Sequence, residues 1–89
     1  MTTEFVKNLW MLQETLNAFL EAGCSEVRRK DMRLWIDPLS GDTQEALNEW
    51  QSKGFVTIVS DLRQSKDKDV CLRILKRIEA LPMPEDLNE

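Results

Sequence analysis

Two aspartates stand at positions where a metal-dependent enzyme would need carboxylates. Asp37 ends an alternating apolar segment, and Asp61 follows a nearly continuous one with Arg63 close behind. At the carboxyl ends of parallel strands these carboxylates would hold Mg²⁺ and Arg63 would receive a phosphate, the basis of phosphoryl transfer or hydrolysis. However, aspartates before proline and after strands are ordinary turn formers. The chain also has no histidine and only three glycines. We therefore predict no catalytic residue, metal or cofactor, and keep a metal-dependent enzyme using Asp37 and Asp61 as an alternative.

A basic segment suggests a second chemistry, the binding of nucleic acid. Arg28, Arg29, Lys30 and Arg33 concentrate positive charge within a few residues. The preceding helix and glycine are typical of a helix-turn-helix, but Phe19 stands where that turn needs a small residue and Arg29 where it needs an apolar one. The formal net charge of -4 also disfavours binding through bulk charge. A nucleic-acid-binding regulator using the segment Arg28–Arg33 is thus a further alternative, not the expected function.

Tryptophan and arginine together favour a third chemistry, contact with another protein, because both are enriched at interface hot spots. Trp35 lies opposite the apolar face of its predicted strand and is flanked by Arg33. Trp50 lies on a helix with few other apolar residues, and Trp10 borders the apolar stripe of its helix; both rings would serve equally well to fill a thin core. We predict a protein-interaction site made of Trp35, Arg33, Arg29, Trp50 and Trp10.

The two cysteines, Cys24 and Cys71, are far apart in the sequence and have no histidine to complete a zinc site. A single disulfide would be unusual for a secreted domain of this size, so we predict two buried free thiols. The amino-terminal segment lacks the basic and apolar regions of a signal peptide, and no apolar run is long enough to span a membrane. These features predict a cytoplasmic protein without membrane contact.

The elements that must position these residues follow from hydrophobic periodicity and turn signals. A stripe at alternating spacings of four and three predicts a helix over 4–22, and a capping box at Asp42 predicts another over 42–53. Alternation predicts a strand over 32–37, and β-branched residues predict a buried strand over 55–59. A last helix is predicted to begin at Ser65 or Asp67 and to run through residue 78.

This order of helix, strand, helix, strand and helix predicts a small α/β domain with a parallel β-α-β crossover. Residues 27–30 are interpreted either as a further strand or as a loop. Residues 1–81 should form one globular domain, followed by a mobile acidic tail at 82–89. The first and last helices should pack on the sheet through Leu9, Leu12, Leu16, Phe19, Ile74, Leu75 and Ile78.

Size and composition limit the function further. A chain of 89 residues with 42% hydrophobic and 31% charged residues is long enough for one small core and is neither disordered nor membrane-embedded. A two-stranded sheet would leave open edges, which favours a homodimer as one form of the protein. We predict a small protein-interaction module without enzymatic activity, an accessory, regulatory or inhibitory factor. Its size and cysteine usage favour a bacterial, phage or plasmid origin.

Overall fold

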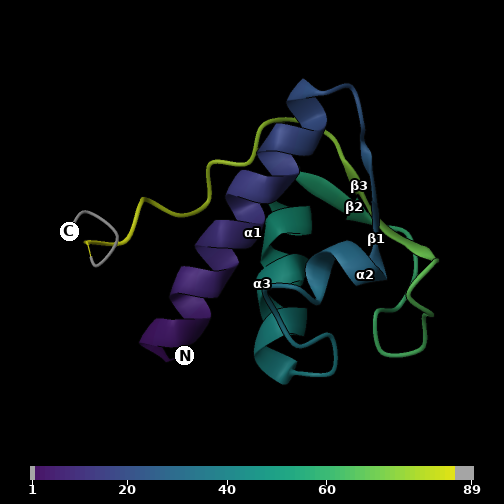
Figure 1. The fold of residues 1–89 in the computed structure, drawn as a ribbon, viewed down its shortest axis with the longest axis horizontal. Helices are drawn as coiled ribbons and strands as arrows, with labels where there is room; N and C mark the ends of the chain where they lie inside the picture. Colours follow the sequence, from purple (N-terminus) through teal and green to yellow (C-terminus); the bar gives the residue numbers. More distant parts are fainter. Residues whose placement is uncertain (1, 86–89) are drawn as a thin grey trace.

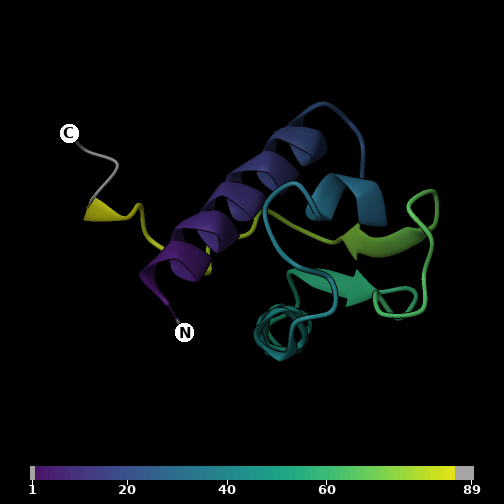
Figure 2. The ribbon, with the colours of Figure 1, turned by 60° about the horizontal axis from the view of Figure 1, so that its bottom comes forward.

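Three helices and three strands make up the computed structural model, which describes residues 2–85 of the chain (Figure 1). In chain order they are α1 (Thr3–Glu21), β1 (Glu26–Arg28), α2 (Arg29–Met32), α3 (Gly41–Ser52), β2 (Val56–Ile58) and β3 (Val70–Ile74). Both views show α1 and α3 on the same side of the sheet (Figures 1 and 2). The arrangement is therefore a mixed α/β fold, and the predicted α/β class is confirmed in this broad sense.

The two long helices are confirmed, and local signals define their ends. The hydroxyl of Thr2 accepts a hydrogen bond from the Phe5 amide at 3.0 Å and so caps α1. The cap of α3 is Ser40, whose hydroxyl accepts from the Asp42 amide at 3.2 Å, so the predicted cap at Asp42 is wrong by two residues. Gly23 and Gly54 follow the two helices with φ of 85° and 80°, a conformation that glycine adopts without steric cost.

The predicted strand over 32–37 is wrong, because this segment contains the end of α2 and a following turn. The amides of Trp35 and Ile36 both donate to the Met32 carbonyl, at 3.0 and 3.1 Å. Met32 and Ile36 are buried whereas Leu34 is 74% exposed. The spacing of four between the buried residues is helical, and the alternation that indicated a strand included one residue that faces solvent.

The predicted last helix is also wrong, because its middle, Val70–Ile74, is the strand β3. Cys71, Leu72 and Ile74 are buried within β3, and Ile78 is buried in the segment beyond it. Leu75 was expected in the core but is 54% exposed. Apolar residues at 70, 74 and 78 fit a helical stripe, but β3 hydrogen-bonds a neighbouring strand on each side. These contacts with residues distant in sequence determine the strand.

The sheet has the order β1-β3-β2, and both pairings are antiparallel. The parallel β-α-β crossover is therefore wrong, since β2 pairs with β3 rather than with a strand that precedes α3. The strand predicted over 55–59 is present as β2, but it lies at an edge and Thr57 is exposed, so only one face is covered. The open segment 27–30 divides into the end of β1 and the start of α2.

The core lies between the inner face of the sheet and the helices. Its largest fully buried members come from every layer: Leu12, Leu16, Met32, Leu47, Leu62, Leu72 and Ile78. Leu9, Leu12 and Leu16 of α1 are buried as predicted, and Phe19 packs against this cluster while partly exposed. The first helix thus contributes the residues that its periodicity indicated.

Side chains hydrogen-bond backbone amides at both edge strands. The Ile58 amide in β2 donates to Gln51 Oε1 at 2.7 Å, and the Arg28 amide in β1 donates to Asp31 Oδ2 at 3.2 Å. Neither amide is then available to a further strand, which reduces the open edge that favoured a dimer. The homodimer stays a prediction.

The C-terminal segment, residues 75–85, leaves the sheet and runs beside α1 (Figure 1). Residues 82–85 of the predicted tail belong to it, and residues 86–89 lie outside the described part of the chain. No helix within residues 2–85 combines the length and apolar character needed to cross a membrane.

Candidate functional site

Two amide side chains, Gln13 and Asn17, hold the C-terminal segment against α1. They are one helical turn apart and are both only 4% exposed. The Ile78 amide donates to Asn17 Oδ1 at 2.7 Å, and Asn17 Nδ2 donates to the Ile78 carbonyl at 3.0 Å. The Asn17 amide group therefore pairs with one residue of backbone much as a neighbouring strand would.

Gln13 repeats this arrangement one turn earlier in α1. Its Oε1 accepts from the amides of Ala80 and Leu81 at 2.9 and 2.8 Å, and its Nε2 donates to the Leu81 carbonyl at 2.9 Å. All of these bonds involve the backbone of the C-terminal segment. They therefore fix its position whatever its side chains are.

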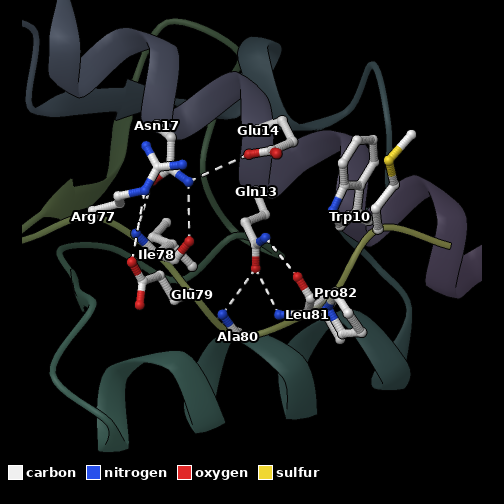
Figure 3. A pocket seen from close by; sticks show the side chains of 11 residues that line it. Trp10, Gln13, Glu14, Asn17, Arg77, Ile78, Glu79, Ala80, Leu81 and Pro82 are labelled. Carbon is white, nitrogen blue, oxygen red and sulfur yellow. Dashed lines mark hydrogen bonds and ion pairs between the residues drawn. The ribbon is translucent and has the colours of Figure 1, made fainter.

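A hollow of about 490 Å³ opens where this segment meets α1 (Figure 3). We call it the α1 groove, and its principal side chains are Trp10, Glu14, Arg77, Glu79, Pro82 and Met83. Trp10 and Glu14 come from α1 and the others from the C-terminal segment. Figure 3 shows Trp10 and Pro82 at one end, with Arg77 and Glu79 at the other. The groove thus joins an apolar end to a charged one.

The charges in the α1 groove are unevenly paired. Arg77 Nη1 lies 3.3 Å from Glu21 Oε1, and Arg77 Nε lies 3.8 Å from Glu79 Oε1. Glu14 has no cationic partner among the described residues, and Asn17 Nδ2, at 3.5 Å, is the donor nearest to its carboxylate. Among the described residues, Arg77 is the only basic side chain that lines the groove, and its ion pairs are with Glu21 and Glu79 rather than with Glu14.

Arg29 and Arg33, both predicted as interaction residues, meet at Asp67. Arg29 Nη1 lies 3.3 Å from Asp67 Oδ1, and Arg33 Nη2 lies 2.9 Å from Asp67 Oδ2. Arg29 Nε also donates to the Leu62 carbonyl at 3.0 Å. The Arg29 side chain is 20% exposed, against 57% for Arg33. These arginines fasten α2 to the loop 60–69, a structural role, and only Arg33 presents much of its side chain to solvent.

The three tryptophans lie in different surroundings. Trp50 is 2% exposed and belongs to the core, so it fills the core and is not part of an interaction surface. Trp35 is partly buried and packs against the core cluster from the turn after α2, with its indole Nε1 buried and unpartnered. Trp10 is partly exposed and lines the α1 groove. The structure thus does not gather the predicted site residues into one surface.

The two aspartates of the enzyme alternative have local roles. Asp37 Oδ1 accepts from the Leu39 amide and Asp61 Oδ1 from the Arg63 amide, both at 2.9 Å. The Arg63 amide, with a smaller contribution from its guanidinium, holds the pKa of Asp61 below its usual value. Within residues 2–85, no group of three or more carboxylates or cysteines is placed to hold a metal ion. Since the sheet is antiparallel, the parallel-strand edge on which this alternative depended is missing.

The cysteines differ from each other in burial. Both are free, as predicted, and Cys71 is buried, but Cys24 is exposed, so the prediction of two buried thiols is wrong for Cys24. Its thiol donates to the Glu26 carbonyl at 3.3 Å at the start of β1. The turn that carries Cys24 lies outside the core, so its sulfur has no apolar layer to enter.

Comparisons with known proteins supply no relative: no family model, no curated protein and no solved structure matches the chain. Sequence reasoning missed Gln13 and Asn17. Their signal was the spacing of four beside the apolar stripe of α1, which indicates two amides at the border of a buried face.

Proposed function

We propose that this protein is a small protein-interaction module, an accessory, regulatory or inhibitory factor whose partner binds in the α1 groove. The observation that carries the proposal is the apolar end of the groove, where Trp10, Pro82 and Met83 line part of a hollow of about 490 Å³. Aromatic residues and methionine are enriched in the centres of protein interfaces. A partner side chain that entered this end would bury apolar surface on both molecules.

The polar groups beneath the groove support a protein partner. Gln13 and Asn17 already satisfy the backbone of residues 78, 80 and 81, so a partner does not have to compete for those groups. Pro82, Met83 and Glu79 are exposed along one wall, so the groove is open to solvent. Small-molecule sites usually enclose most of the ligand surface, and an open groove suits a segment of another protein better.

Affinity capture with matched variants tests this proposal. The tagged protein, Met83→Glu and Trp10→Ala are compared with Leu34→Glu, which changes an apolar residue that is 74% exposed and does not line the groove. We expect the unmodified protein and Leu34→Glu to capture the same protein from native lysate, identified by mass spectrometry. Both groove variants should lose it, because they remove the apolar surface that the partner buries.

The same samples contain the opposing outcome. Circular dichroism and thermal unfolding establish that each variant is folded, and Met83→Glu, which alters a side chain that is 48% exposed, should keep the fold. Capture that survives both groove variants but is lost in Leu34→Glu would contradict the proposal. It would place the interaction surface on the turn after α2 instead.

A further inference from the structure

We infer that the α1 groove selects an arginine side chain of the partner, stacked on Trp10 and paired with Glu14. This inference rests on the proposed function and identifies the chemistry that the groove would recognise. Trp10 and Glu14 are four residues apart on α1, so their side chains are neighbours on one face of the helix. Both line the same hollow (Figure 3).

The Glu14 carboxylate has no ion pair among the described residues. This side chain is partly buried, and among the described residues its carboxylate accepts one side-chain hydrogen bond, from Asn17 Nδ2 at 3.5 Å. Partial burial weakens the hydration of a carboxylate, and a cation within a few ångströms restores its stabilisation. Since Glu14 forms no ion pair among residues 2–85 and Arg77 pairs with Glu21 and Glu79, a cationic group of the partner would complete this part of the groove.

The indole ring of Trp10 lies next to Glu14 on α1 and favours a cation as well. An aromatic face attracts a cation through its quadrupole, and tryptophan does so most strongly. A carboxylate one helical turn away adds an opposite charge on the same side. Arginine fits this pair better than lysine because its planar guanidinium can stack on the indole while its N–H groups point at the carboxylate.

Arg77 does not remove this preference. Its guanidinium is shared between Glu21 at 3.3 Å and Glu79 at 3.8 Å. Among residues 2–85, the charged side chains that line the groove are Glu14, Glu79 and Arg77, so two negative charges face one positive charge there. The groove therefore complements a basic side chain, and its apolar end complements an apolar residue next to it.

A pair of matched peptides tests the inference on the full-length protein. The probes are acetyl-Leu-Arg-amide and acetyl-Leu-citrulline-amide, because citrulline is a neutral analogue of arginine with nearly the same shape. Binding is followed at constant ionic strength through the indole N–H signal of Trp10 in ¹H–¹⁵N NMR spectra, assigned with Trp10→Phe. We expect the arginine peptide to bind about fivefold more tightly than the citrulline peptide, the size of a partly exposed cation–π contact with an ion pair.

Two isosteric variants separate the site from the overall charge. Glu14→Gln should reduce the preference for the arginine peptide to the part that the cation–π contact with Trp10 supplies, and its carbonyl can still accept from Asn17. Glu45→Gln makes the same charge change at an exposed position that does not line the groove, and should leave the preference unchanged. Equal binding of the two peptides, or equal losses in both variants, would overturn the inference.

The outcomes also distinguish this inference from the proposed function. If the citrulline peptide binds as well as the arginine peptide and the groove variants still lose the captured protein, the groove is an interaction site without a preference for arginine. If the arginine peptide binds selectively but capture does not depend on Met83 or Trp10, the cation site exists and the proposed function is wrong.

Discussion

The α1 groove and the junction between α2 and the loop 60–69 both join segments far apart in sequence through polar side chains, but they use different residues. In the groove, Asn17 bonds the backbone of Ile78, 61 residues away. In the junction, Arg29 bonds Asp67, 38 residues away. The groove is joined by amides that are almost fully buried, whereas the junction is joined by charges that remain partly in water.

This difference determines which of the residues that are common in protein interfaces, such as tryptophan and arginine, remain available to a partner. In the junction, the arginines are themselves the joining residues, so the guanidinium of Arg29 is already bonded to Asp67 and to a carbonyl. In the groove, the amides join the segments and leave Trp10 and Glu14 beside an open hollow. Residue type alone therefore does not mark an interaction site. The internal hydrogen bonds of the residue must also be known.

Removing the buried amide of the groove should have the largest effect. In Asn17→Leu the amide and carbonyl of Ile78 stay buried and lose their partners. The cost of unsatisfied buried polar groups predicts a fall of about 3 kcal/mol in the free energy of unfolding. Asn48→Leu, at an exposed position of α3, is the matched control and should change it by less than about 0.5 kcal/mol.

Urea unfolding followed by tryptophan fluorescence measures both values. A loss in Asn17→Leu no greater than in Asn48→Leu would contradict the account, because it would mean that the C-terminal segment is not held by this amide. The contrast between buried amides that join the groove and charged side chains that join the junction would then not hold.

The parts of the fold that local chemistry determines were predictable. An apolar stripe indicates the helix over 4–22, and a capping signal indicates the helix over 42–53. A glycine follows each, and both helices are present as α1 and α3. The strand β3 was not predictable in this way. Its apolar residues also fit a helical stripe, and the choice is made by hydrogen bonds to β1 and β2, which lie far from it in the sequence.

The candidate site was predictable only in part. Trp10 was named from its residue type and its position at the border of a stripe, and it does line the groove. Trp50 has the same type but is buried, because the apolar side of α3 lies against the core. Gln13, Asn17 and Glu14 could not be singled out, since their importance depends on a backbone segment more than sixty residues further along the chain.

The junction should respond less than the groove, and unequally at its two arginines. Arg29→Ala removes the bonds to Asp67 and to the Leu62 carbonyl from a side chain that is 20% exposed. We expect a loss of about 2 kcal/mol in the free energy of unfolding. Arg33→Ala breaks the ion pair with the same Asp67 from a side chain that is 57% exposed, and should cost about 0.5 kcal/mol. Equal losses in the two variants, measured by urea unfolding, would show that the charge of Asp67, not the burial of Arg29, controls the junction.

The smallest expected effect concerns Asp61, in the loop that the junction holds. Its folded-state pKa lies below its usual value chiefly because the Arg63 amide donates to its carboxylate, so this contact stabilises the fold at neutral pH and stops doing so as the pH falls through the lowered pKa. NMR titration of the carboxyl group measures that pKa directly. Arg63→Ala should leave the pKa still lowered, because the variant keeps the backbone amide and removes only the guanidinium 3.5 Å away. A return to the usual value would show that the side-chain charge dominates, and the loop would then be organised by ion pairs throughout, like the contact between Asp67 and the two arginines.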